Sequence, residues 1–204
     1  MTNEHYFSPQ PSSASQPYVI TVALPEGTLK LTTDRGVFSY GALDTGTRLL
    51  LLKAPPPAAT GNLLDLGCGA GAIAISMARR SPGATVWAVD VNERAIALTR
   101  QNAEANNVSN VRCCLPDEVP ADVRFDTIWS NPPIHIGKGP LHDLLLRWLP
   151  RLTEAGHATM VVQKHLGSDS LQVWLTAQGY PTERLASAKG FRLLNTTQST
   201  SNPR

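Results

Sequence analysis

Two short motifs in this chain could do chemistry together: a glycine-rich run and an Asn-Pro-Pro sequence. The first is Leu63-Leu64-Asp65-Leu66-Gly67-Cys68-Gly69-Ala70-Gly71, in which an apolar stretch leads into three alternating glycines and a helical pattern follows. Glycines at such a turn let the backbone approach a ligand closely, and the helix points its N-terminal amides at it. The second is Asn131-Pro132-Pro133-Ile134, which ends another apolar stretch. Together they predict one site for a cofactor and one for a planar amine.

The glycine spacing and two acidic residues indicate the kind of cofactor. Dinucleotide-binding turns favour G-x-G-x-x-G, whereas this chain has G-x-G-x-G with Asp65 two residues before the first glycine. A carboxylate there would repel a pyrophosphate, but it suits a cofactor with an ammonium and a sulfonium. Asp90 ends an apolar stretch about 20 residues beyond the turn, where an acid accepts hydrogen bonds from ribose hydroxyls. These features predict S-adenosylmethionine; the alternative is a structural turn with a surface aspartate.

The Asn-Pro-Pro sequence offers two acceptors for the hydrogens of an exocyclic base amine. Such an amine is a poor nucleophile because its lone pair is delocalised into the ring, and acceptors that bind its N–H groups can aim the lone pair at a methyl group. Asn131 offers a side-chain carbonyl and Pro132 a backbone carbonyl, while the prolines fix φ. Methyl transfer would depend on orientation and proximity, without a strong general base. The alternative is an Asn-Pro turn that merely ends a strand.

Composition agrees with one compact domain. The chain has 204 residues and 42% hydrophobic content, which can bury a full core. It has no run of about 20 apolar residues that could span a bilayer, and no signal stretch, so we expect a cytoplasmic protein without a membrane partner. Its three cysteines, Cys68, Cys113 and Cys114, fit reduced thiols and lack metal-ligand spacing, so no metal is expected. The net charge of +2 permits an RNA partner.

Short strands alternate with helices along the chain, which predicts an α/β fold with a largely parallel sheet. We expect a mobile segment at 1–17, a single domain at 18–197 and a tail at 198–204; within the domain, a hairpin and a helix at 45–53 form an extension (18–58) to a catalytic core (59–197). In the core, strands are predicted at 62–66, 85–89, 111–115, 125–130, 157–163, 182–188 and 191–195, and helices at 71–80, 93–106, 140–152 and 168–178. Both motifs would then follow strand carboxyl ends, where open sheets bind ligands.

With these motifs, the chain resembles the small methyltransferase domain of ribosomal RNA guanine-N2 methyltransferases, especially the single-domain archaeal-type members. The resemblance runs from about residue 18 to 197 and also includes Gly36-Val37-Phe38-Ser39, Leu43-Asp44-Thr45-Gly46-Thr47-Arg48-Leu49-Leu50 and Gly190-Phe191-Arg192-Leu193-Leu194. It implies the seven-stranded, mostly parallel, Rossmann-like fold of class I S-adenosylmethionine-dependent methyltransferases. It further implies methyl transfer to guanine N2 of ribosomal RNA, with 16S-type RNA favoured. The substrate would be RNA or a ribosomal subunit particle, and the enzyme a monomer or homodimer.

The resemblance also implies residue roles. Asp65 and the first two glycines of the turn would line the methionine part of the cofactor, and Asp90 would hold its ribose. Phe38, Leu43 and Asp44 would help close the pocket, and the Asn-Pro-Pro motif would hold the guanine amine. The full predicted sets are Asn131, Pro132, Pro133 and Ile134 for catalysis, and Phe38, Leu43, Asp44, Asp65, Gly67, Cys68, Gly69, Gly71, Asp90, Val91, Asp117 and Asn131 for the cofactor.

The chain departs from the family pattern at two places. An acidic residue usually follows the third core strand directly and meets the adenine amine. Here Asp117 is a displaced candidate and Glu118 a weaker one, and an exposed loop residue is the alternative. Many amino-methyltransferases also place an aromatic residue after Pro-Pro, where it stacks on the target base. This chain has Ile134, which can give apolar contact only.

Other functions stay open at this point. Adenine N6 or a protein glutamine side chain could be the acceptor, because Asn-Pro-Pro serves those classes too. A non-catalytic RNA-binding or assembly module is a different class, and the intact set of Asp65, Asp90 and Asn131 argues against it. Several basic side chains could meet RNA phosphates or be ordinary solvated charges: His135, Lys138, Lys164, His165, Lys189 and Arg192.

Overall fold

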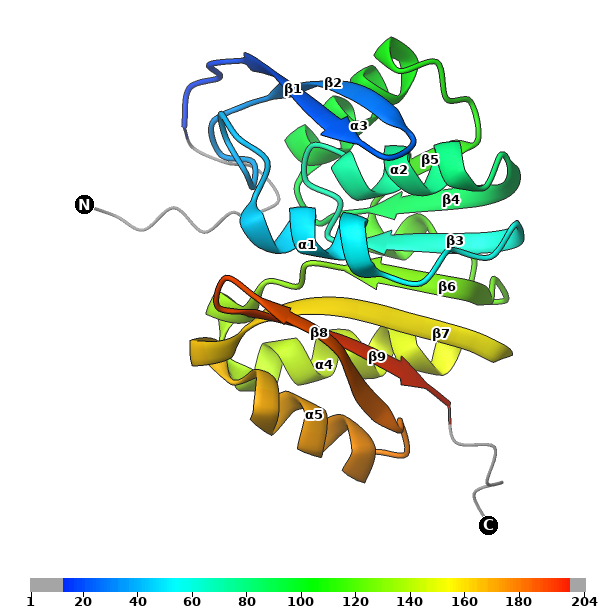
Figure 1. The fold of residues 1–204 in the computed structure, drawn as a ribbon. Helices are drawn as coiled ribbons and strands as arrows, with labels where there is room; N and C mark the ends of the chain where they lie inside the picture. Colours follow the sequence, from blue (N-terminus) through cyan, green and yellow to red (C-terminus); the bar gives the residue numbers. More distant parts are fainter. Residues whose placement is uncertain (1–12, 199–204) are drawn as a thin grey trace.

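The computed structural model of the protein describes residues 13–198, in which seven strands form one sheet and two form a separate hairpin (Figure 1). The strands are β1 (Tyr18–Leu24), β2 (Gly27–Thr33), β3 (Thr60–Leu66), β4 (Gly83–Val89), β5 (Val111–Cys114), β6 (Phe125–Ser130), β7 (Leu152–Gln163), β8 (Thr182–Ala188) and β9 (Phe191–Thr197). The sheet order is β5-β4-β3-β6-β7-β9-β8. Neighbours from β5 to β7 are parallel, and β9 is antiparallel to β7 and β8. The predicted sheet is confirmed.

Helices cover both faces of this sheet. They are α1 (Thr45–Lys53), α2 (Ala72–Arg80), α3 (Glu93–Ala105), α4 (Lys138–Trp148) and α5 (Ser168–Ala177). Apolar side chains of α1, α2 and α3 share one core with Leu63, whereas those of α4 and α5 share a second core with Leu64. Successive strand residues point to opposite faces, so β3 is apolar on both sides and neither leucine is exposed.

The order of the strands places the predicted motifs at one edge. From β3 the chain builds outward through β4 and β5, then returns to the other side of β3 with β6 and β7. Ligands bind at the strand carboxyl ends where the order reverses in this way. The glycine turn follows β3, Asp90 follows β4 and Asn131 follows β6. All three therefore meet at that edge.

Helix α4 differs from the helix predicted at 140–152. It begins at Lys138 and ends at Trp148, a 3-10 turn follows at Leu149–Arg151, and β7 already begins at Leu152. Pro150 explains the early end, because proline has no N–H for the helix and its ring collides with the preceding turn. Because the helix ends early, β7 starts at Leu152, five residues before the predicted start at residue 157, and is correspondingly long.

The hairpin packs on α3 through two asparagines. Asn102 donates to the carbonyl of Thr32 at 2.8 Å and accepts from its N–H at 2.8 Å. Asn106 does the same for Lys30, at 2.8 Å and 3.2 Å. Residues four apart in a helix are separated by a rise of about 6 Å, and residues two apart in a strand by about 6.6 Å. The spacing of the two asparagines therefore matches that of Lys30 and Thr32. The two amides thus take the place of a neighbouring strand along the outer edge of β2.

The predicted mobile segment at 1–17 and tail at 198–204 lie mostly outside the described residues. Where the described chain begins, Ser15 donates from its hydroxyl to Asp34 at 2.7 Å, and Arg94 of α3 donates to the carbonyl of Ser13 at 3.0 Å. Residues 13–15 therefore run beside the start of α3. Between residues 13 and 198, no helix is long and apolar enough to cross a membrane.

Candidate active site

The turn after β3 consists of glycines in a left-handed backbone conformation. Gly67, Gly69 and Gly71 have φ values of 81°, 55° and 85°, which other residues adopt only with strain. Gly71 also lies against Thr99 of α3, whose Cγ2 would be 2.9 Å from a Cβ at this position. Helix α2 starts directly after it, at Ala72. The turn therefore brings bare backbone and the start of a helix to the ligand-binding edge.

Asp65 lies behind the turn. It is fully buried; its Oδ2 accepts from the N–H of Ala74 at 2.9 Å, and its Oδ1 has no hydrogen-bond partner in the described part of the chain. Burial raises the pKa of Asp65 to about 8, the bond from Ala74 opposes this, and the Asp90 carboxylate adds to it. The carboxyl thus holds the first turn of α2. A cation bound nearby would favour its ionised form.

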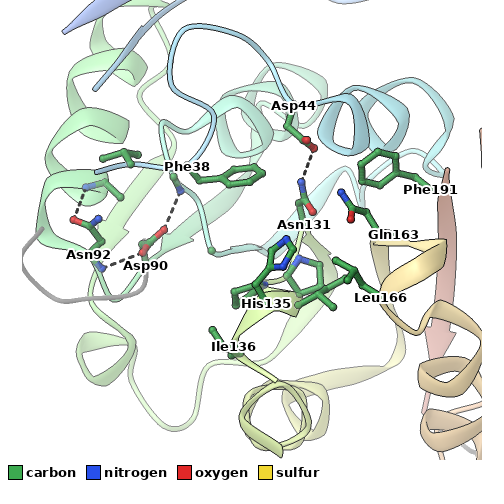
Figure 2. A pocket seen from close by; sticks show the side chains of 17 residues that line it. Phe38, Asp44, Asp90, Asn92, Asn131, His135, Ile136, Gln163, Leu166 and Phe191 are labelled. Carbon is green, nitrogen blue, oxygen red and sulfur yellow. Dashed lines mark hydrogen bonds between the residues drawn. The ribbon is translucent and has the colours of Figure 1, made fainter. Parts of the chain in front are cut away.

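Asp90 connects the glycine turn to the start of α3. Its Oδ2 accepts from the N–H of Gly69 at 3.0 Å, and its Oδ1 accepts from the N–H of Asn92 at 3.0 Å (Figure 2). Burial raises the pKa of Asp90, and the backbone N–H bonds that it accepts oppose the rise. Asn92 donates to the carbonyl of Gly36 at 2.8 Å. The acid is thereby linked to the loop that precedes α1.

Two acceptors fix the orientation of the Asn131 amide. Its Nδ2 donates to Asp44 Oδ1 at 2.8 Å (Figure 2) and to Thr47 Oγ1 at 3.0 Å. An ionised carboxylate can only accept, so the nitrogen faces Asp44 and the carbonyl oxygen is left for a ligand. Asp44 also caps α1 by accepting from the N–H of Thr47 at 2.8 Å. The N-terminal extension thus orients a residue of the core.

The Pro-Pro step forms a tight turn. The carbonyl of Pro132 accepts from the N–H of Ile134 at 2.8 Å, and Pro133 has φ −74° and ψ 72°, the geometry of an inverse γ-turn. A carbonyl oxygen has two lone pairs, so a second donor can still bind Pro132. The turn holds this oxygen one residue from the oriented amide of Asn131.

A cavity of about 480 Å³ joins these parts of the molecule (Figure 2). The predicted residues that line it are Phe38, Asp44, Gly67, Gly69, Asp90, Asn131, Pro132, Pro133 and Ile134. Two more, Leu43 and Cys68, line a smaller adjoining hollow. The structure therefore brings both motifs and the N-terminal extension around one space.

Four predicted cofactor residues line neither space: Asp65, Gly71, Val91 and Asp117. Asp65 lies behind the turn, and Gly71 is the last glycine of the turn, packed against Thr99 of α3. Val91 is 38% exposed. The side chain of Asp117 is 92% exposed and pairs with Arg147 of α4 at 2.6 Å. Cofactor contact by these four residues stays a prediction.

The cavity also has lining residues outside the predicted catalytic and cofactor sets: Val37, Asn92, Ala95, His135, Ile136, Gln163, Leu166 and Phe191. Asn92 could have been found as a helix N-cap two residues after Asp90. Gln163 ends β7, and the rule that ligands bind at parallel strand ends includes it. Phe191 begins the antiparallel β9, so the rule for the ends of parallel strands does not predict it.

The comparison with protein families decides the identity of the chain. The model of the methyltransferase small domain matches residues 28–195. The chain belongs to this family. The match contains both motifs and all residues that line the cavity. Membership of the methyltransferase small domain family confirms the predicted family, and with it S-adenosylmethionine as the cofactor.

Curated relatives of this methyltransferase small domain include one of similar length and several longer enzymes. The uncharacterized protein YbxB of Bacillus subtilis is 36% identical over 171 residues, which are 82% of this chain and 85% of the relative. Ribosomal RNA small subunit methyltransferase C of Shewanella amazonensis is 34% identical over 149 residues, which are 71% of this chain and 43% of the relative. The domain thus spans less than half of the latter enzyme.

Solved structures share the fold of this methyltransferase small domain. The T. thermophilus 16S rRNA N2 methyltransferase RsmC, in complex with AdoMet and guanosine, has a TM-score of 0.78 at 23% identity, over 91% of this chain and 51% of that one. A ribosomal protein L11 methylase of Lactobacillus delbrueckii has a TM-score of 0.57 at 21% identity, and the match covers 69% of this chain and 70% of that one. At these identities the likeness shows the class I methyltransferase fold.

Proposed function

We propose that this domain transfers a methyl group from S-adenosylmethionine to the exocyclic N2 amine of guanine in small-subunit ribosomal RNA. The observation that carries the proposal is the orientation of Asn131. Its amide nitrogen is bound by Asp44 and Thr47, so its carbonyl oxygen and that of the neighbouring Pro132 can accept from a ligand in the cavity. Two neighbouring acceptors fit the two N–H groups of a planar amine.

The other end of the cavity suits the methyl donor. Gly67 and Gly69 would hold its methionine part through bare backbone, and Asp90 would accept from its ribose hydroxyls. The Oδ1 of Asp65, which has no hydrogen-bond partner among residues 13–198, lies just behind the turn and belongs to a carboxyl that a nearby cation would ionise. When bound, the cofactor supplies an electrophilic methyl group on a sulfonium. The donor set therefore fits a cofactor that is cationic at one end and carries a ribose.

The residues of the chain act by orientation. Asn131 and Pro132 accept the two amine hydrogens, which turns the nitrogen lone pair out of conjugation and toward the glycine turn. The amine nitrogen would gain positive charge on accepting the methyl group that the sulfonium supplies, and Asn131 and Pro132 would stabilise that charge. The nitrogen then releases a proton to water. Proximity and alignment supply the acceleration in this mechanism.

The choice of guanine in ribosomal RNA is supported by relatives. Enzymes named ribosomal RNA small subunit methyltransferase C match 71% of this chain at 34% identity in one case, and the similar fold of RsmC was solved with guanosine. Adenine N6 and a glutamine side chain are the competing acceptors, because each presents a planar N–H₂ group to the same carbonyls.

The test is methylation of RNA from cells that lack this protein, with purified enzyme and labelled S-adenosylmethionine, followed by mass spectrometry of the nucleosides. We expect N2-methylguanosine in small-subunit ribosomal RNA. If the label enters only adenine, or only protein, the acceptor is adenine N6 or a glutamine side chain and not guanine. If calorimetry detects no binding of S-adenosylmethionine, the protein is instead a non-catalytic RNA-binding or assembly module.

A further inference from the structure

Gln163 and Phe191 stand side by side at the cavity. They are direct partners in the antiparallel pairing of β7 and β9, so their side chains leave the same face of the sheet with Cβ atoms about 5 Å apart. Both line the cavity beside Asn131 (Figure 2). The pair thus borders the end of the cavity that holds the acceptors for the amine.

A glycine in α1 makes room for the aromatic ring. A Cβ on Gly46 would lie 2.7 Å and 2.8 Å from two ring carbons of Phe191. Glycine weakens a helix relative to alanine, so its presence in the first turn of α1 needs a reason, and the ring supplies one. The ring of Phe191 is therefore packed closely against α1 on one side and borders the cavity on another.

The backbone around Phe191 is held on both sides. The N–H of Lys164 donates to the carbonyl of Gly190 at 2.7 Å, directly before the ring. Arg192, directly after it, is 9% exposed and forms an ion pair with Asp169 of α5. The aromatic ring is thus presented by a well-fixed strand end.

The two side chains have the chemistry of a nucleobase site. An aromatic ring stacks on any base, and a primary amide has both a donor and an acceptor. The Gln163 amide makes no hydrogen bond to another described residue, so both groups are available to a ligand. Beside its N2 amine, guanine presents the N1–H donor and then the O6 acceptor, which one amide can bind together. The atoms that flank the N6 amine of adenine are acceptors only, so the amide oxygen would stay unpaired.

We propose that Phe191 stacks on the target base and that Gln163 pairs with its N1–H and O6 edge. The pair would provide the stacking that Ile134 cannot, from a strand remote from the Asn-Pro-Pro motif in sequence. This inference rests on the proposed function, because it takes the guanine N2 amine as the acceptor. It adds the residues that recognise the base to those that orient its amine.

The test compares Phe191→Leu, Phe191→Tyr and Gln163→Met with the native enzyme on ribosomal RNA that lacks the modification. Phe191→Leu should lower kcat/KM about 10- to 100-fold, the size of a lost base stack, and Phe191→Tyr should restore most of it. Binding of S-adenosylhomocysteine by calorimetry should stay unchanged. Tyr18→Leu, which removes an exposed aromatic of β1 outside the cavity, is the matched control and should leave kcat/KM unchanged.

A second measurement separates this inference from the proposed function. Saturation-transfer NMR on the protein loaded with S-adenosylhomocysteine should show guanosine bound in preference to adenosine, with the preference reduced by Gln163→Met and binding lost in Phe191→Leu. If the native enzyme methylates guanine while Phe191→Leu is fully active, the recognition pair is wrong and the function stands. If the native enzyme neither methylates guanine nor binds guanosine, both proposals fail.

Discussion

At the scale of single residues, the orientation of Asn131 is set by two residues that lie more than 80 positions earlier in the chain. Asp44 and Thr47 belong to the N-terminal extension, and both accept from the Asn131 amide. Asp44 accepts at the same time from the backbone of α1, so the position of the helix decides where the carbonyl of Asn131 points.

Replacing Asn131 tests this arrangement. We expect Asn131→Ala to lower kcat about 10²- to 10³-fold, the typical loss when one group that stabilises the transition state is removed. Its affinity for S-adenosylhomocysteine should stay within about threefold, because Asp90 and the glycine turn, which would hold most of the cofactor, are unchanged. Thr47→Val removes one of the two hydrogen bonds from the Asn131 amide. It should lower kcat much less than Asn131→Ala does, because Asp44 still orients the amide. Steady-state kinetics and calorimetry measure both, and near-normal turnover of Asn131→Ala would refute the role of this residue.

Asp90 is the counterpart in the cofactor site. We expect Asp90→Ala to weaken binding of S-adenosylhomocysteine about 10- to 100-fold, the loss of a hydrogen bond to a charged group. Asp122→Ala, an exposed aspartate in the loop before β6, is the control for the change of charge. Calorimetry measures the affinity of both variants for S-adenosylhomocysteine. If Asp90→Ala binds it as tightly as the native protein does, Asp90 does not hold the ribose.

The buried carboxyl of Asp65 predicts a dependence of stability on pH. Burial disfavours the charged form and raises the pKa of Asp65 in the folded protein to about 8, far above the 3.8 of an exposed aspartate. The folded state therefore binds the proton more tightly than the unfolded state, and the stabilisation present below about pH 4 is lost as the pH rises toward 8. Asp65→Asn keeps a neutral acceptor for Ala74 and should remove this loss. Urea unfolding from pH 5 to 8 checks it; parallel pH profiles of the two proteins would contradict the assignment.

At the scale of elements, the contact between the glycine turn and α3 sets how closely α2 and α3 approach. Gly71→Ala should lower the free energy of unfolding by about 1–3 kcal/mol, the strain of a non-glycine residue at positive φ, and the contact with Thr99 adds to it. Gly139→Ala is the control, because a Cβ there meets no atom within 4 Å. It should change stability by less than about 1 kcal/mol, in the stabilising direction. Urea titration of both variants compares them, and equal losses would mean that the turn tolerates a side chain.

The sequence predicted those elements whose signals are local. The apolar strands and the glycine and proline motifs carry their own chemistry, so β3, β4, β6 and the cavity edge follow from them. Pro150 was a local signal too, and the helix prediction across it was wrong. The pairing of Phe191 with Gln163 could not be predicted in the same way, because it depends on the register between β7 and β9. That register is a property of the folded sheet, not of either segment.

At the scale of the whole molecule, the cavity is assembled from two parts of the chain. Val37, Phe38 and Asp44 come from the segment before α1, and the remaining lining residues come from strand ends, loops and the start of α3 between residues 67 and 191. Asn92 links the two through the carbonyl of Gly36. A ligand in the cavity therefore contacts both parts, and its binding should stabilise them together.

Hydrogen exchange gives this prediction a measurement. Saturating S-adenosylhomocysteine should slow exchange of backbone amides at 34–44 as well as at 67–71, because the ligand would touch both segments. The exposed edge strand β8 is the internal control and should exchange at an unchanged rate. Protection confined to 67–71 would mean that the N-terminal extension takes no part in holding the cofactor.

The asparagine pair that covers β2 has a consequence for how the chain is made. Thr32 and Asn102 are 70 residues apart, and Lys30 and Asn106 are 76 apart. At a translation rate of about 5–20 residues per second, the hairpin leaves the ribosome roughly 4–15 s before the helix that covers its edge. During that interval the N–H and C=O groups of Lys30 and Thr32 lack the partners that the finished fold gives them. The nascent hairpin is then open to pairing with any other extended strand, until α3 arrives and closes it.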